Sequence, residues 1–581
     1  MLYPELRELE TSREMIDVFK GYNHNLRIGN GEFYEMKNLS SQYYPVLSPR
    51  PQRGLYAESG ENYGLISKDA LCYVDGEDFV INDYHVPMKL NSEPKTLISM
   101  GAYVIIMPDK KYVDTENFAT QTQFNIEEEN TTTGQTTFTL CKLDGTEYKD
   151  ATVSNTAPSD PQNLDLWIDT STTPNSLKQY AATTELWTSI ATTYIKISST
   201  GIGVGIAEGD GVAISGITDT SLADLNNTMV VWARGDDYIV VVGMLKELKT
   251  QAANKPITVT RKMPNMDFII ESGNRLWGCR YGVALNGEVV NEIYASKLGD
   301  FKNWNNFAGI STDSYVASVG TDGQFTGAIT YLGYPIFFKE NHMHKVYGNY
   351  PANYQVQTTA CRGVQKYCSK SLAIVNETLY YKARSGVCAY DGSLPTEISS
   401  AFGDISYSNA VAGALNNKYY ISMMDEEEIY HLFVYDVAKG MWHREDNTHA
   451  LQFCANRGDL YYIDDSDKWI KSVKGSGTTE KLPIKWEAIT GIFGTDSPDK
   501  KYISRLDVRL LLSPGSTVTF YAEYDSSEVW EHLHTMVGTS LRSFAVPIRP
   551  KRCDHLRLRI VGQGDAKIYS ICKTIEQGSD I

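Results

Sequence analysis

The chain of 581 residues is too long for one ordinary hydrophobic core, and its length predicts about three or four structural units. Hydrophobic residues make up 42% and charged residues 22%, a balance that argues against wholesale disorder. The formal charge of −17 disfavours a general phosphate-binding surface, because proteins that grip nucleic acids place Lys and Arg against phosphates. An acidic wall would instead let DNA slide past without sticking.

The sequence carries no sign of export or of membrane insertion. Its first residues include several acids and no apolar core, so we expect no secretory signal, and no stretch reaches the ~20 apolar residues that span a bilayer. The nine cysteines are scattered without a C-x-x-C pair, which predicts reduced, buried thiols. We therefore expect a chain that is made and folded in a cytoplasm, with no membrane span.

Residues 1–54 read as an N-terminal arm. Apolar residues in 8–22 fall at helical spacing and predict a short helix, and three prolines within 44–54 then force an extended path. An extended segment of this kind must lie against something, and we expect it to cross a neighbouring subunit. The candidates for this inter-subunit contact are Tyr43, Tyr44, Arg50, Pro51 and Arg53.

A loose repeat of strand, turn and strand follows the arm. Its two best-matched copies begin at Leu65 and Leu97 and share Leu-Ile-Ser, a turn, Ala and an apolar run. Five further copies begin at Phe268, Ala328, Leu372, Val411 and Leu451. A small or apolar strand, a turn of Gly, Asn or Asp and an aromatic-rich strand are typical of consecutive antiparallel strands. The repeat predicts an all-β fold with a six- or seven-bladed β-propeller over 55–115 and 257–474, with an array of sandwiches as the alternative.

Two further units complete the predicted domain organisation. Residues 116–256 interrupt the repeat with a Thr-rich stretch, which predicts an inserted small β domain, either a barrel or a sandwich. In 475–581 apolar residues alternate with charged ones, as Leu506, Val508 and Leu510 do with their neighbours, and this pattern predicts a C-terminal β-sandwich.

Motifs for cofactors, metals and nucleophiles are missing from the sequence. It has no P-loop, G-x-S-x-G or H-E-x-x-H. Two histidine pairs, 342/344 and 532/534, have no nearby third metal ligand, and Cys361 and Cys368 have no local histidine partner. We accordingly predict no catalytic, cofactor-binding or metal-binding residue, and we assign Trp277, Trp304 and Trp442 to the packing of the blades.

Carboxylates are a further class of candidate catalytic residues, because propellers can be glycosidases and a glycoside hydrolase usually needs two carboxylates across one sugar. The sequence offers many candidates in turn contexts next to Gly or Ser, where an Asp side chain caps the local backbone. These are Asp300, Asp313, Asp322, Asp391, Asp404, Asp436, Asp464 and Asp465. Because no focused pair stands out, the chain is predicted not to be an enzyme.

Three short stretches carry a resemblance to a known family. Residues 30–39 with 49–54, residues 291–304 and residues 165–171 together resemble the phage propeller proteins called packaged-DNA stabilisation or tail nozzle proteins. The resemblance implies a structural virion protein of a tailed phage. For such a protein the resemblance implies a homo-oligomeric ring, with a hexamer as the expected state, and other neck and tail proteins as partners.

The ring implied by the resemblance would act as a head-tail connector or nozzle that continues or closes the DNA channel until DNA ejection. DNA would pass through it without specific binding. Two alternatives remain open: a tail-tip protein that binds host-surface glycans, and a propeller glycosidase.

Overall fold

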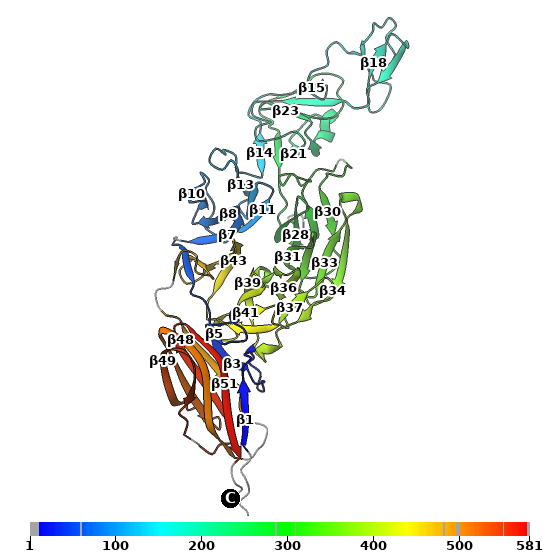
Figure 1. Cartoon of the computed structure of the whole chain (residues 1–581). Helices are drawn as coiled ribbons and strands as arrows, with labels where there is room; N and C mark the ends of the chain where they lie inside the picture. The colour runs from blue at the N-terminus through cyan, green and yellow to red at the C-terminus, as the bar shows by residue number, and fades with distance from the viewer. Residues whose placement is uncertain are drawn as a thin grey trace, which may run out of the picture.

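The computed structural model describes residues 11–58, 61–284, 287–307, 309–479, 483–494, 500–549 and 551–577. Three regions follow one another along a long axis, with an inserted module at one end, a β-propeller in the middle and a C-terminal module at the other end (Figure 1). Strands make up nearly all of the regular secondary structure of the described residues, and the few 3-10 helices there are too short to cross a bilayer. The predicted all-β fold class is confirmed.

The propeller has seven blades, and the seven repeat copies supply their two inner strands. The innermost strands are β7 (Asn62–Lys68), β11 (Thr96–Met100), β27 (Phe268–Ser272), β31 (Phe325–Tyr331), β35 (Ala373–Val375), β39 (Ser408–Leu415) and β43 (Ala450–Asn456). Each pairs antiparallel with the next strand of its blade. These second strands are β8 (Ala70–Asp75), β12 (Tyr103–Met107), β28 (Arg275–Val283), β32 (Tyr334–Lys339), β36 (Thr378–Lys382), β40 (Lys418–Met424) and β44 (Asp459–Asp464).

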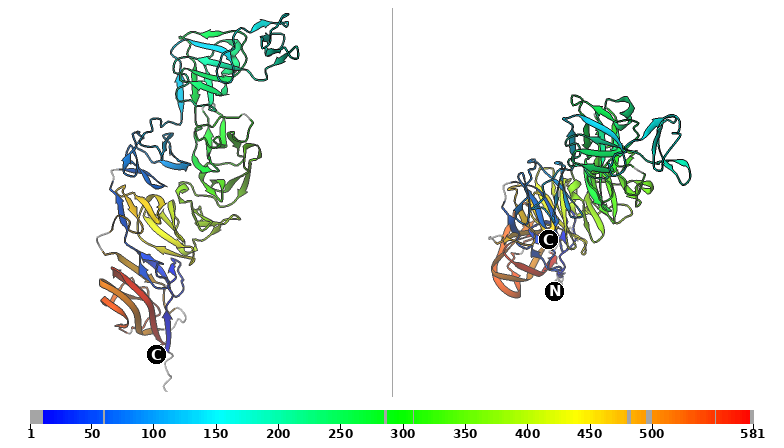
Figure 2. Two further views of the ribbon diagram at one scale, coloured as in Figure 1. Left: turned by 45° about the horizontal axis from the view of Figure 1, so that its top comes forward. Right: turned by 90° about the horizontal axis from the view of Figure 1, so that it is seen from above.

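The blades follow one another around a closed ring, as the left view of Figure 2 shows. Neighbouring innermost strands are in contact, β43 touches β7, and the 3-10 helix η3 (Ser369–Ser371) bridges β31 and the fifth blade. The outer strands are β9 (Asp78–Ile81), β10 (Tyr84–His85), β13 (Lys111–Asp114), β29 (Val289–Ala295), β30 (Tyr315–Ser318), β33 (His342–Tyr347), β34 (Gln355–Ala360), β37 (Val387–Tyr390), β38 (Thr396–Glu397), β41 (Tyr430–Asp436), β42 (Met441–Arg444) and β45 (Ile470–Ser472).

The inserted module leaves the propeller between the second and third blades. It contains a four-stranded sheet, a five-stranded sheet and a small sheet that lies farthest from the propeller (Figure 1). Its strands are β14 (Glu128–Thr131), β15 (Thr136–Cys141), β16 (Thr152–Ser154), β17 (Leu166–Asp169), β18 (Ser176–Ala181), β19 (Leu186–Ser189), β20 (Tyr194–Ser198), β21 (Gly211–Ser215), β22 (Thr228–Val230), β23 (Ala233–Gly235), β24 (Tyr238–Val242), β25 (Lys249–Gln251) and β26 (Thr258–Arg261). Buried side chains from all three sheets, most of them aliphatic, form one core.

The N-terminal arm is built into the fold of its own chain. The predicted helix over 8–22 is wrong, because residues 11–16 form the strand β1 (Thr11–Ile16). The first three residues of that prediction, 8–10, lie outside the described residues. The other arm strands are β2 (Gly21–Tyr22), β3 (Glu32–Lys37), β4 (Leu39–Ser40), β5 (Ser48–Pro49) and β6 (Gly54–Ala57). Strand β6 pairs with β45 and β46 (Thr478–Thr479) and so completes the seventh blade with the N-terminal end of the chain.

The C-terminal module consists of β47 (Lys485–Thr490), β48 (Lys501–Tyr524), β49 (Glu531–Val546), β50 (Leu556–Gln563) and β51 (Ala566–Gln577). The long strand β48 pairs with β51 along its first half and with β50 along its second half. The predicted alternation is confirmed, because the side chains of Leu506, Val508 and Leu510 are fully buried. β1 pairs with β51, β3 with β47 and β2 with β42, so the arm joins this module to the sixth blade in one continuous sheet.

Candidate functional site

The principal candidate site is a cavity of about 400 Å³ on the axis of the propeller. Residues at or beside the innermost strands of six blades line it. They include Thr96, Leu97, Phe268, Ile269, Ala328, Leu372, Ala412, Gln452 and Phe453. Ligand sites are typically concave and largely apolar, with a few converging polar groups. Most of the lining residues are apolar, although polar atoms make up about half of the exposed lining surface, and the few titratable side chains determine what the cavity can do chemically.

Asp267 lies directly before β27 and is the one carboxylate among the described residues that line the axial cavity. Its side chain accepts a hydrogen bond from the backbone N–H of Tyr281 at 2.8 Å. Partial burial raises the pKa of this carboxyl, because the neighbouring protein removes water that would stabilise the charged form. Asp267 is nevertheless exposed to solvent, so a ligand in the cavity can reach it.

Two lysines also line the axial cavity: Lys95, which is fully buried and paired with Asp109, and Lys370 in η3. The ammonium group of Lys370 donates a hydrogen bond to the backbone carbonyl of Leu451 at 3.1 Å. The surrounding protein lowers the pKa of Lys370 by desolvation. A carboxyl with a raised pKa and an amine with a lowered one therefore line the same pocket, a combination that is enriched at functional sites.

Neither Asp267 nor Lys370 was among the residues singled out from the sequence. A positional signal did exist, since each residue stands within two positions of the start of a repeat copy, at Phe268 and at Leu372. Several of the candidate aspartates cap turns as expected. Asp391 accepts from the backbone N–H of Ser393, and Asp464 from that of Ser466, both at 3.0 Å.

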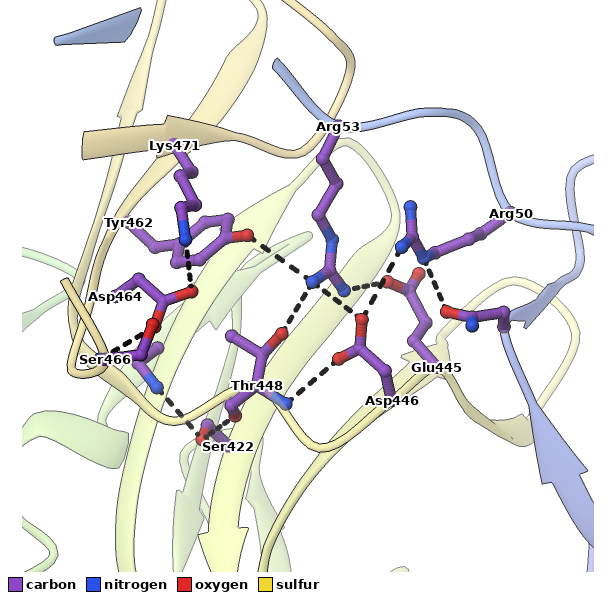
Figure 3. A network of polar contacts seen from close by, with 12 residues as sticks. Arg50, Arg53, Ser422, Glu445, Asp446, Thr448, Tyr462, Asp464, Ser466 and Lys471 are labelled. Carbon is purple, nitrogen blue, oxygen red and sulfur yellow. Dashed lines mark hydrogen bonds and ion pairs between the residues drawn. The ribbon is translucent and has the colours of Figure 1, made fainter. Parts of the chain in front are cut away.

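The arm residues Arg50 and Arg53 lie in a buried polar network inside the chain (Figure 3). Arg53 is 6% exposed and forms ion pairs with Glu445 at 2.8 Å and Asp446 at 2.7 Å. It also donates to the hydroxyl of Thr448 at 2.6 Å. Arg50 is 7% exposed and lies 3.6 Å from the same Asp446 carboxylate. Both side chains thus fasten the arm to the sixth and seventh blades of their own propeller.

The other arm candidates lie near the junction with the C-terminal module. Tyr43 and Pro51 line a cavity of about 610 Å³ between the arm and the turns of that module. Tyr43 is also stacked beneath the ammonium group of Lys567 at 3.9 Å, and Tyr44 faces Lys439. Both tyrosines are partly exposed. Contact of these residues with another subunit stays a prediction.

The three tryptophans assigned to packing are all buried. Trp277 lies on β28, Trp442 lies on β42, and Trp304 packs with residues around β11 and β27. Each indole N–H donates to a backbone carbonyl. Burial and these hydrogen bonds explain the three tryptophans as packing residues of the blades.

Metal and thiol chemistry find little support in the described ranges. No group of three or more His, Cys, Asp or Glu side chains there could hold a metal ion. Burial raises the pKa of Cys361 to about 11, which opposes thiolate formation despite the nearby Arg362.

Comparisons with known proteins give structural similarities alone, since no family model and no curated protein matches the sequence. An exo-β-1,3-galactanase from Phanerochaete chrysosporium is 8% identical over 52% of this chain and 94% of its own, with a TM-score of 0.21. A family 43 arabinoxylan arabinofuranohydrolase from Bacillus subtilis is 7% identical over 52% and 94%, with a TM-score of 0.16. A sialidase from Trypanosoma rangeli is 7% identical over 97% and 95%, with a TM-score of 0.23.

These comparisons contradict the expectation of a non-enzymatic virion protein. The matching structures named above are carbohydrate-active enzymes, and none is a component of a phage neck or tail. The predictions of a structural tail protein and of a chain without enzymatic activity are therefore corrected. At these TM-scores the likeness carries no argument for a particular activity, which has to come from the site itself. The predicted ring, its partners and its location in a virion are not tested by the comparisons.

Proposed function

We propose that this protein acts on a carbohydrate in the axial cavity, and that Asp267 is the acid that protonates the leaving oxygen during glycoside cleavage. The observation that carries the proposal is the solvent-accessible Asp267 carboxyl, whose pKa is raised inside a cavity lined by six blades. A general acid must hold its proton near the working pH, and desolvation of a carboxyl has this effect.

The rest of the cavity suits a sugar. Phe268 and Phe453 offer apolar surface to the C–H face of a sugar ring, while Gln452 and Lys370 offer donors for hydroxyl groups. The usual glycosidase mechanism needs a second carboxyl about 5 to 10 Å from the first. Since Asp267 is the single carboxylate in the described lining of the cavity, we assign only the protonation of the leaving group.

The test separates binding from cleavage. Binding of a panel of mono- and oligosaccharides is followed by ligand-observed NMR, and release of sugar from aryl glycosides and polysaccharides is measured across pH 4 to 9. Asp267→Asn is expected to retain binding, because an amide still forms hydrogen bonds, and to lose at least about a hundredfold in rate. Asp404→Asn changes an exposed carboxyl elsewhere and is expected to match the parent protein.

The pH profile gives a second readout of Asp267. Because its pKa is raised, the proton is held to higher pH, and the alkaline limb of the rate profile should report this group. Absence of binding to every sugar would reject the proposal. A cleavage rate unchanged in Asp267→Asn would reject the role of Asp267.

A further inference from the structure

A second candidate site lies on the outer face of the C-terminal module, far from the propeller axis. Strands β1, β51, β48 and β49 are neighbours in that order and form this face (Figure 1). A groove of about 440 Å³ crosses it. Small side chains line its floor, namely those of Ser543, Ala545, Ser570 and Cys572, and they leave room between the longer side chains around them.

Three arginines surround this groove. Arg505 and Arg509 lie on the same face of β48, on either side of Asp507, and Arg13 comes from β1. Asp507 pairs with Arg505 at 2.9 Å and with Arg13 at 3.3 Å, so one carboxylate is shared by two guanidinium groups. The groove therefore keeps an excess of positive charge.

Arg509 has the least-engaged guanidinium of the three. Its Nε donates to the hydroxyl of Ser543 at 3.1 Å, and no ion pair holds it within the described part of the chain. Arg505 and Arg509 are both exposed to solvent. Guanidinium groups recognise carboxylate, sulfate and phosphate through paired N–H donors, and the two ends of the groove present such donors.

Most of the groove lining lies in the part of the chain that does not carry the large negative charge. Residues 475–581 contain 14 Lys and Arg against 13 Asp and Glu, a formal charge of +1. The preceding 474 residues contain the remaining 40 and 58, a formal charge of −18. An anionic ligand is therefore repelled less by the C-terminal module, which is close to neutral, than by the rest of the chain.

We propose that this groove binds an acidic polysaccharide through the carboxylate or sulfate groups that such a polymer carries. Hydroxyl groups of Ser543 and Ser570 on the floor suit a ligand rich in hydroxyls. Among the described residues that line the groove, Phe544 is the one aromatic side chain, and the Arg542 guanidinium covers its ring at 4.4 Å. The ring is thus not free to stack on a nucleobase, which favours a polysaccharide over a single-stranded nucleic acid.

The proposal extends the carbohydrate function inferred for the axial cavity, from which the groove is separate. Affinity electrophoresis and calorimetry with dextran sulfate and with polygalacturonate measure binding, and neutral dextran is the matched polymer without charge. We expect binding of at least one acidic polymer and none of neutral dextran, with affinity that falls as salt is added. The Arg505→Gln/Arg509→Gln double variant should bind at least about tenfold more weakly.

Two further variants make the test specific. Arg384→Gln removes an exposed arginine of the fifth blade and should bind like the parent protein. Asp507→Asn removes the one carboxylate of the described groove lining and should strengthen binding. Equal binding by the double variant, or no binding of either acidic polymer, would overturn the proposal. The proposal would also be overturned, in favour of nucleic acid as the ligand, if the parent protein bound an oligonucleotide more tightly than either acidic polymer and the double variant lost that binding.

The proposal for the axial cavity can be rejected independently of the proposal for the groove. Asp267→Asn should leave binding of acidic polymer unchanged, and the groove variant should leave sugar release from small glycosides unchanged. Loss of release with intact polymer binding would therefore concern the axial cavity alone.

Discussion

Replacing Arg53 by methionine should destabilise the closure of the propeller. Methionine keeps an apolar stem of similar length and removes the charge that neutralises Glu445 and Asp446. The Glu445 side chain is almost fully buried and Asp446 is largely so, and after the substitution only Arg50 would remain beside Asp446. Removing one partner of a buried ion pair lowers the free energy of unfolding by about 3 to 5 kcal/mol, because the other charge is left uncompensated.

This cost is large enough to see by calorimetry. For domains of 150 to 250 residues, 1 kcal/mol shifts the melting temperature by about 2 to 4 °C, so Arg53→Met should melt about 6 to 20 °C lower. Because a chain with several modules need not unfold in one step, hydrogen exchange should be followed alongside the melting curve. The amides of β6 and β45 should lose protection, since Arg53 lies at the edge of that strand pair.

Two variants serve as controls for Arg53→Met. Arg384→Met changes an exposed arginine and should melt with the parent protein. Arg53→Met/Glu445→Gln removes both charges of one pair and should recover part of the loss. The reasoning fails if Arg53→Met melts within about 2 °C of the parent protein and β6 keeps its protection.

Three other substitutions test separate parts of the fold. A Cβ on Gly54 would lie 2.1 Å from the backbone oxygen of Ser476, so Gly54→Ala should lower the melting temperature, whereas Gly320→Ala meets nothing within 4 Å and should not. Burial lowers the pKa of His344 to about 4, so its neutral form contributes stability that is complete above pH 6.5 and is lost as the pH falls toward 4. Thermal melts of His344→Gln should accordingly change less between pH 7 and pH 4.5 than those of the parent protein, and an identical pH dependence would contradict this assignment. Leu558 is fully buried in the C-terminal module, and Leu558→Ala should reduce the stability of that module by about 2 to 5 kcal/mol in urea titrations, with an unchanged midpoint as the contrary result.

The blades were predictable because their signal is local. Each repeat copy holds a strand, a tight turn and a second strand within about a dozen residues, a pattern that hydrophobic periodicity and turn residues make visible. The alternation around Leu506 and Leu510 is equally local, and both residues are buried as predicted. The inner hairpins of all seven blades could therefore be placed before the structure.

The arm was not predictable in the same way, because its partners are distant in sequence. The helical spacing of Met15, Val18 and Phe19 is a coincidence of composition, since β1 pairs in register with β51 at the other end of the chain. A pairing of this kind leaves no trace in a short window. For the same reason the arginines of the arm were expected to contact another subunit, whereas their carboxylate partners lie in the segment that connects the sixth blade to the seventh.

The axial cavity could not be predicted from the sequence either. Asp267 is one of many aspartates beside a strand, and its raised pKa arises from the blades packed around it. Nothing in the local sequence distinguishes it from Asp391 or Asp464, which cap exposed turns. The position of a carboxyl on the axis of a propeller depends on closure of the ring, which is a long-range property.

The pairing of β6 with the seventh blade sets the order in which this chain can fold during synthesis. Gly54 emerges from the ribosome before any blade, while its partner Ser472, in β45 of the seventh blade, emerges after the other six. The middle blades are made of adjacent hairpins and can form as they appear, but the arm must wait, with the edges of its strands unpaired. Ring closure and the docking of β1 on β51 are therefore late events in folding, because both need strands that follow the middle blades in the sequence.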